Sequence, residues 1–185
     1  MALITQAEAR EALPELTSDD PRVAAMIVSA DAILAGWCGY PTRGVLPPTF
    51  LPVDYVFRAL TPDGEELKLP VYPIVRIDEV DEEPDETDEA EGILYRSDRW
   101  PSTVRVEAVC GFGVVEDGEV VTQIPDDIKR AATLYVRHLW DLRKIQGRQS
   151  TSQQGGSVSH RAETIPDPVR QILGPRVLWR NRWGL

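Results

Sequence analysis

The chain has 185 residues with 20 Lys and Arg against 30 Asp and Glu, a formal charge of −10, and 42% hydrophobic residues. This length predicts one domain, or one domain with an appendage, and it excludes a need for disulfides or a structural metal to bury a core. The acidic balance argues against gripping nucleic acid, which relies on Lys and Arg. A membrane span is not expected either, because Ser29 and Asp31 interrupt the most apolar stretch, residues 23–37.

The N-terminal residues 1–10 lack a basic start followed by an apolar run, which predicts a cytosolic chain without a secretory signal. Cys38 and Cys110 stand far apart and outside any metal-ligand spacing, so we expect buried free thiols rather than a disulfide or redox pair. Neither His138 nor His160 has a Cys or carboxylate partner at ligand spacing. No metal and no cofactor is therefore predicted.

Thr5 followed by Glu8 forms a capping-box pattern, which predicts a short helix at the start of the chain. Asp caps, Pro21 and apolar residues at three- and four-residue steps predict a second helix that ends at 36–39. A third helix is predicted to start at Pro125 and to end before Gly147, and a short fourth one covers 167–173.

Between the second and third helices, the pattern changes to that of a small antiparallel β-unit inserted at about residues 53–113. Four prolines between 41 and 52 mark a loop that leads into it. Alternating or β-branched runs then predict strands at 53–57, 71–77, 92–96 and 103–109, with a turn at 62–64.

Ten carboxylates crowd into residues 78–91, where we expect a solvated, mobile loop between strands. They are Asp78, Glu79, Asp81, Glu82, Glu83, Asp85, Glu86, Asp88, Glu89 and Glu91. A calcium loop would need a glycine at its sharp turn, and a glycosidase pair would need a cleft that the sequence does not indicate. The remaining hypothesis is electrostatic: the loop repels DNA phosphates in a channel or attracts a basic partner.

The C-terminal quarter contains a Ser-, Gln- and Gly-rich stretch, and residues 148–164 are predicted to be a flexible linker. Residues 165–185 are predicted to hold a short helix and an extended arm. Two tryptophans and three arginines lie within residues 176–183, and these residue types are enriched in interface hot spots. We interpret this segment as an arm that orders on a partner. The alternative is that its tryptophans pack onto the chain's own core.

Catalytic motifs such as G-x-S-x-G, a P-loop or H-E-x-x-H are missing, and residues 110–114 lack the third glycine of a dinucleotide fingerprint. The chain is therefore predicted not to be an enzyme. A cytosolic regulatory protein-binding module and, less favoured, an enzyme of unrecognised type remain as alternatives.

The order of these signals resembles the head-tail connector (adaptor) proteins of long-tailed bacteriophages and of phage-derived gene transfer agents. The resemblance rests on residues 36–40, 69–77, 104–113, 124–131 and 165–173. The acidic loop and the tryptophan-rich tail depart from the family's pattern. The fold implied is α+β, mainly an α-helical bundle over residues 1–147 with the inserted β-unit, plus the extended C-terminal arm.

The resemblance further implies a structural virion protein that forms a ring, twelve-fold in the family, below the portal. Such a ring extends the DNA channel and joins the filled head to the tail or to the next head-completion protein. The implied partners are the portal protein, neighbouring copies, a stopper or tail-completion protein and double-stranded DNA in non-specific passage, with no membrane. The implied location is the head-tail interface of a virion or gene transfer agent particle, after assembly in the bacterial host cytoplasm. The implied portal-binding residues are Arg176, Leu178, Trp179, Arg180, Arg182 and Trp183.

The net charge conceals a polarity along the chain. Residues 1–127 hold 27 acidic and 9 basic side chains, whereas residues 128–185 hold 3 acidic and 11 basic ones. An acidic body would let DNA slide past without sticking, while the basic end would dock on a neighbouring protein.

Overall fold

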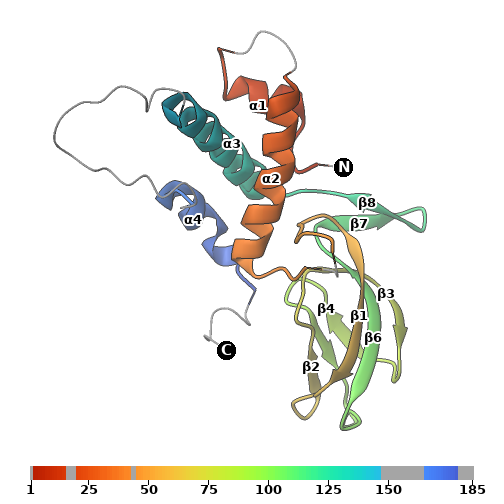
Figure 1. Ribbon diagram of the computed structural model, residues 1–185. Coiled ribbons are helices and arrows are strands. Elements are labelled where there is room, and N and C mark those ends of the chain that lie inside the picture. The colour runs from red at the N-terminus through yellow and green to blue at the C-terminus, as the bar shows by residue number, and fades with distance from the viewer. Residues whose placement is uncertain (1, 16–19, 43–44, 147–164, 179–185) are drawn as a thin grey trace, which may run out of the picture.

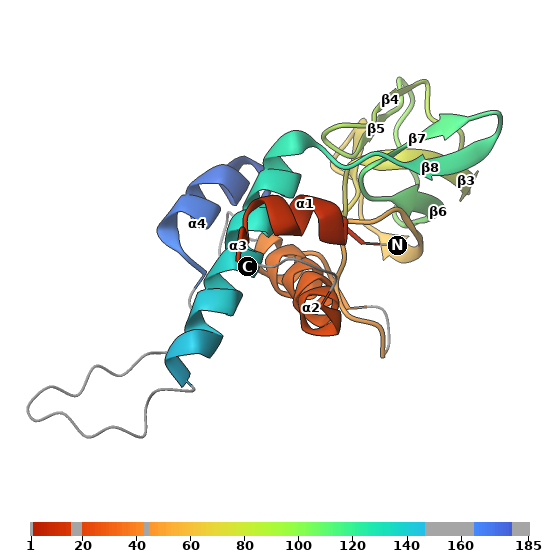
Figure 2. The same ribbon diagram turned by 90° about the horizontal axis from the view of Figure 1, so that it is seen from above.

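The computed structural model describes residues 2–15, 20–42, 45–146 and 165–178, and it separates a helical part from a β part (Figure 1). The helices are α1 (Gln6–Glu11), α2 (Pro21–Cys38), α3 (Asp126–Gln146) and α4 (Asp167–Leu173), followed by the 3-10 turn η1 (Gly174–Arg176). Helices α2 and α3 pack against each other, α4 packs on α3, and α1 lies across the α2–α3 pair (Figure 2).

The β part contains eight strands in three small antiparallel sheets. The first sheet has the order β1-β6-β3, with β1 (Val53–Leu60), β6 (Val104–Cys110) and β3 (Ile74–Val80). The second has the order β2-β5-β4, with β2 (Glu66–Lys68), β5 (Ile93–Tyr95) and β4 (Glu86–Asp88). The third is a hairpin of β7 (Gly113–Glu116) and β8 (Glu119–Thr122).

This architecture corrects the expectation of a mainly α-helical bundle with a small β-insertion: the fold is mixed α+β. The β part forms three sheets and stands beside the helices as a comparable body (Figure 1). The expectation was wrong because three-residue strands such as β2 and β4 carry almost no periodicity of their own. They are stabilised by pairing with β5, and a local sequence pattern cannot predict such pairing.

The helix termini follow from local chemistry. Thr5 and Glu8 form the predicted capping box, since the Glu8 amide donates to the Thr5 hydroxyl at 3.1 Å and the Glu8 carboxylate accepts from the Thr5 amide at 2.6 Å. At the start of α2 the Asp20 carboxylate accepts from the Arg22 amide at 2.8 Å. Gly39 ends the helix with φ of 93°, a left-handed conformation that glycine adopts without strain.

One hydrophobic core runs through both parts. From α2 it takes the face formed by Val23, Ile27, Ala30 and Leu34, and from α3 it takes Ile128 and Tyr135. The strands add their inward residues, among them Leu67, Leu94 and Val106. Because the cluster is continuous, the β part is packed on the helices rather than tethered to them.

By length and composition, α2 is the one helix of the described chain that could cross a membrane. Core helices of globular proteins pass the same test, and α2 places a buried face against α3. Its Asp31 also accepts a hydrogen bond from the Thr49 hydroxyl at 2.6 Å, as expected of a helix that packs within a fold.

Candidate interaction surfaces

The acidic segment 78–91 contains more regular structure than the predicted loop. The end of β3 and the whole of β4 lie in it and are held by sheet pairing, with bends and turns between and after them. Two of its carboxylates also fix the backbone around it. Asp81 accepts from the Arg105 amide at 2.7 Å, and Asp85 accepts from the amide and hydroxyl of Ser97 at 2.6 and 2.7 Å. These bonds from Ser97 lower the pKa of Asp85.

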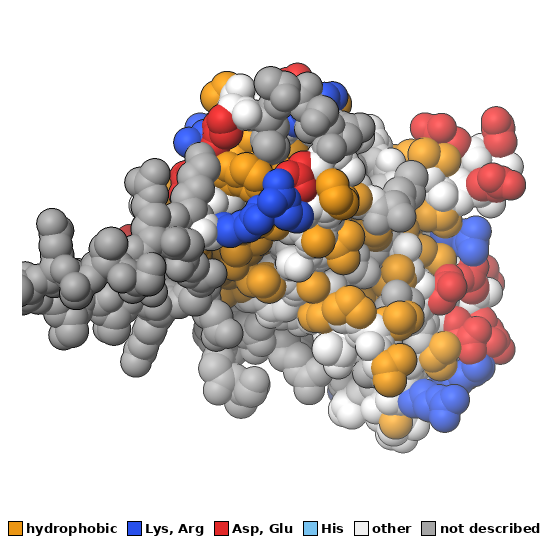
Figure 3. Space-filling model, turned by 45° about the horizontal axis from the view of Figure 1, so that its top comes forward, with side chains coloured by type: hydrophobic (Ala, Val, Ile, Leu, Met, Phe, Trp, Pro, Cys, Tyr) orange, Lys and Arg blue, Asp and Glu red, His pale blue; other side chains and the backbone are white. Residues whose placement is uncertain are grey.

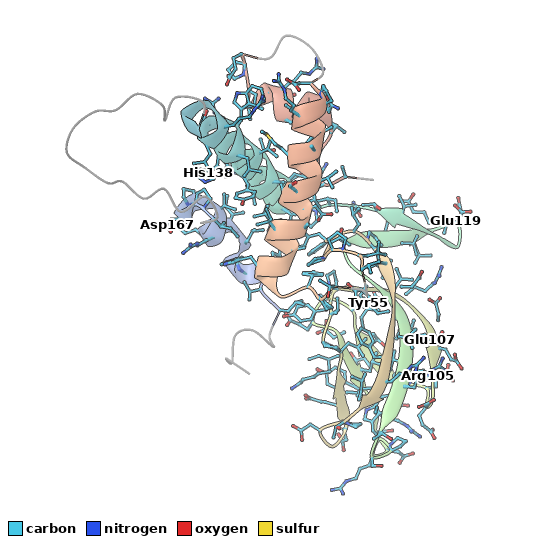
Figure 4. The ribbon with its side chains drawn as sticks, viewed as in Figure 1. Tyr55, Arg105, Glu107, Glu119, His138 and Asp167 are labelled. Atoms are coloured by element: carbon cyan, nitrogen blue, oxygen red, sulfur yellow. The ribbon has the colours of Figure 1, made fainter. Side chains whose placement is uncertain are left out.

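Arginines on the neighbouring strands partly balance this charge. Arg76 pairs with Asp78 at 2.6 Å, Arg96 pairs with Glu82 at 3.0 Å, and Arg105 pairs with Glu79 at 3.0 Å. Arg105 also pairs with Glu107 beside it on β6, as Figure 4 shows. The side chains concerned are between 21% and 60% exposed, so each pair contributes little to stability.

Acidic and basic side chains gather along one edge of the molecule, whereas apolar side chains cover much of the adjoining surface (Figure 3). The acidic segment contributes to two edge strands, β3 of the first sheet and β4 of the second. Charged strand edges of this kind suit a surface presented to DNA or to a basic partner, the two roles that the sequence suggested.

Of the predicted portal-binding residues, Arg176 and Leu178 lie in the described chain, and both are held by the body of the protein. Arg176 donates from Nε to Asp127 Oδ2 on α3 at 2.9 Å, and its guanidinium lies 5.3 Å from the centre of the Phe112 ring. Leu178 is 1% exposed, and its amide donates to the Cys38 carbonyl at 2.8 Å. These two residues therefore anchor the C-terminal segment to the fold.

The remaining members of that predicted set lie outside the described residues, as does the predicted linker at 148–164. These members are Trp179, Arg180, Arg182 and Trp183. Leu178, the last described residue, is anchored against the C-terminal end of α2.

The β7–β8 hairpin is a surface that the sequence reasoning missed. Asp117 and Gly118 form its turn with φ of 50° and 82°, both in the left-handed region. An Asp-Gly pair between two valine-rich runs is a strong hairpin signal, and it could have been used. Val115 and Val121 are 45% and 40% exposed on this hairpin.

The thiols are buried as predicted, and burial raises the pKa of both Cys38 and Cys110 to about 12. Within the described ranges, no cluster of three or more His, Cys, Asp or Glu is placed to hold a metal ion. His138 lies on α3 (Figure 4), with its ring 6.0 Å from that of Tyr135.

The family model for head completion proteins matches residues 2–176, nearly the whole chain, and the chain belongs to this family. The prediction of a connector-type protein is thereby confirmed. The family is structural and non-enzymatic, which also confirms the prediction that the chain is not an enzyme. At the level of the family, the predicted location in the head-tail region of a phage or gene transfer agent particle is confirmed as well.

Among solved structures, the fold is similar to a chain in the neck of an empty gene transfer agent (GTA) particle computed with C6 symmetry. The TM-score is 0.53 at 13% identity, over 96% of this chain and 94% of that chain. At this identity the likeness concerns the fold alone. No curated protein matches the chain.

Proposed function

We propose that this head completion protein forms a ring in the neck of a phage or gene transfer agent particle, directly below the portal. The observation that carries the proposal is the family match over residues 2–176, supported by the fold shared with a chain of a particle neck. In this role each copy contacts two neighbouring copies, the portal on one side and a stopper or tail-completion protein on the other. The ring continues the DNA channel, and we take twelve copies as the working number.

The portal contact is assigned to the segment that follows Leu178. The anchoring of Arg176 and Leu178 fixes where this segment leaves the body, next to the C-terminal end of α2. Trp179 and Trp183 are then the apolar anchors, and Arg180 and Arg182 are the charged partners. Arg176 and Leu178 support the segment from within the fold.

A truncation tests this assignment, and the structure determines where it must begin. Removing residues from 176 onward would also delete a half-buried ion pair and a buried leucine, so the test chain ends at Leu178. Its matched control keeps residues 179–185 in scrambled order. We expect both to fold, and we expect both to lose most of their binding to purified portal in a pull-down. Unchanged binding by the truncated chain would exclude the segment as the portal contact.

The acidic edge of β3 and β4 is proposed to face the channel, where carboxylates keep DNA from adhering. This proposal follows from the order of the edge and from the excess of acids in residues 1–127. Neutralising Glu86, Glu89 and Glu91, which form no ion pair with other described residues, is expected to slow DNA ejection because DNA then adheres to the channel wall. A matched variant neutralises three exposed carboxylates outside the acidic segment, Asp63, Glu65 and Asp98. Equal ejection rates in wild type and in the variant of Glu86, Glu89 and Glu91 would contradict the proposal that this edge faces the channel.

A further inference from the structure

The β7–β8 hairpin carries more apolar surface than its own chain covers. None of its four valines, Val114, Val115, Val120 and Val121, is buried. In the hairpin register Val114 lies opposite Val121 and Glu116 opposite Glu119, so these four side chains share one face. The other face carries Val115, Val120 and Thr122. Val120 and Thr122 line a hollow against β1 and β3, which Glu119 joins from the tip. The Val114–Val121 face is open to solvent, since Val121 is 40% exposed.

The tip of this outward face is acidic. Glu116, Asp117 and Glu119 are all exposed there, and Figure 4 shows Glu119 at the far end of the hairpin. A two-stranded ribbon is only marginally stable in water without packing on at least one face. The hairpin thus presents an apolar face with a negative end, and its tip points away from α2 and α3 in both ribbon views (Figures 1 and 2).

A groove with an apolar lining and a basic end lies between α2 and α3. It has a volume of about 430 Å³. Its apolar lining includes Met26, Ile33, Leu139 and Leu142, and Arg22 and Arg143 also line it. Ile33 is 41% exposed although it is a large apolar residue on a helix. Arg22 pairs with Asp20, and the Arg143 guanidinium lies 5.6 Å from the centre of the Trp140 ring.

Arg22 stands in the first turn of α2 and Arg143 in the last turns of α3, so the two basic residues mark one end of the groove. A hairpin that enters with its tip toward this end places Glu116 and Glu119 near Arg143. It also lays Val114 and Val121 along the apolar lining. Charge and apolar surface thus match in the same orientation.

We propose that the β7–β8 hairpin of one copy docks in the α2–α3 groove of the next copy. The two surfaces belong to different parts of the same chain, so the contact is head-to-tail, the type of contact that closes into a ring. This inference rests on the ring assembly proposed above and names the surfaces that build it.

Disulfide trapping tests the contact. One purified variant carries Val121→Cys and the other Ile33→Cys, and the two are mixed at high concentration under mild oxidation. Cys38 and Cys110 can stay, since both are buried and burial raises the pKa of each to about 12. We expect a disulfide-linked dimer of the two variants. The control pairs V121C with Val56→Cys, which is 49% exposed on β1, and should give about tenfold less product.

A charge exchange provides the second measurement. Glu119→Arg and Arg143→Glu are each expected to reduce trapping between the cysteine variants about tenfold, whereas the double exchange restores it. Trapping no greater than in the Val56 control, or no restoration by the double exchange, overturns the proposal. If electron micrographs show rings while trapping fails, the proposed ring is supported and the proposed hairpin contact is refuted.

Discussion

Arg176 on η1 and Asp127 in the first turn of α3 are joined through Nε and Oδ2 at 2.9 Å, although 49 positions separate them in the chain. The contact ties the C-terminal segment to the helix that follows the β part. The arginine also covers Phe112, which lies just before β7. One side chain thus connects the C-terminal segment, α3 and the β part.

Replacing Arg176 by Ala is expected to lower the free energy of unfolding by about 1 kcal/mol, because a half-exposed ion pair and a cation–π contact are lost together. Arg170→Ala serves as the matched control. Its carboxylate partner Asp167 lies 3.9 Å away and is 85% exposed, so the expected loss is no more than about 0.5 kcal/mol. Urea denaturation of both variants measures the difference, and equal losses would refute the anchoring role.

Asp31 gives a prediction about pH. Its carboxylate accepts from the Thr49 hydroxyl at 2.6 Å and from the Phe50 amide at 3.1 Å, but burial is the dominant influence and raises its pKa above 3.8. The folded chain therefore takes up this proton before the unfolded chain does. Stability should rise, relative to Asp31→Asn, as the pH falls from neutral through the folded-state pKa.

The measurement is urea denaturation of wild type and D31N at about pH 7 and about pH 4. The compared quantity is the difference in the free energy of unfolding between wild type and D31N. A shift of this difference in favour of wild type at the lower pH supports the assignment, and a shift in favour of D31N contradicts it. Asp31→Ala is expected to cost about 1–3 kcal/mol at either pH, since it leaves the Thr49 and Phe50 donors without their acceptor.

Gly111 should not tolerate a side chain. Its φ is +133°, and a Cβ there would lie 2.5 Å from the Leu51 carbonyl oxygen. Gly111→Ala is expected to cost about 2–4 kcal/mol. Gly174→Ala, where no atom lies within 4 Å of the added Cβ, should stay within about 0.5 kcal/mol of wild type. Thermal unfolding of the two variants decides the point, and a stable Gly111 variant would contradict the close approach of the two backbones.

Cys38 and Cys110 are expected to be inert in the folded protein. They are 0% and 1% exposed, and burial raises the pKa of each to about 12, so almost no thiolate exists near neutral pH. A thiol-reactive dye should label neither in buffer and both in guanidinium. Labelling of wild type in buffer at the rate of Val121→Cys would show that the fold opens around these residues.

Sequence patterns predicted the parts of the fold that local chemistry controls. The capping box at Thr5 and the left-handed Gly39 bound α1 and α2 as expected, and the third and fourth helices begin within a residue or two of their predicted starts. Strands β1, β3 and β6 also lie close to the alternating runs that predicted them. These signals are local, so one sequence suffices to detect them.

What the sequence could not predict depends on partners far along the chain. The acidic residues of β4 resemble a loop because their charge opposes burial, and only pairing with β5 makes them a strand. The anchoring of Leu178 depends on the Cys38 carbonyl, 140 positions earlier. The β7–β8 hairpin is different, since its Asp-Gly turn was readable in the sequence.

Deletion of its gene is the most direct test of the claim that this protein completes the neck of a particle. Particles produced without the protein, viewed by electron cryomicroscopy, are expected to be heads that lack tails. The full chain supplied in trans should restore tailed particles, with a ring of density below the portal. Tailed particles in normal number from the deletion strain would contradict the claim.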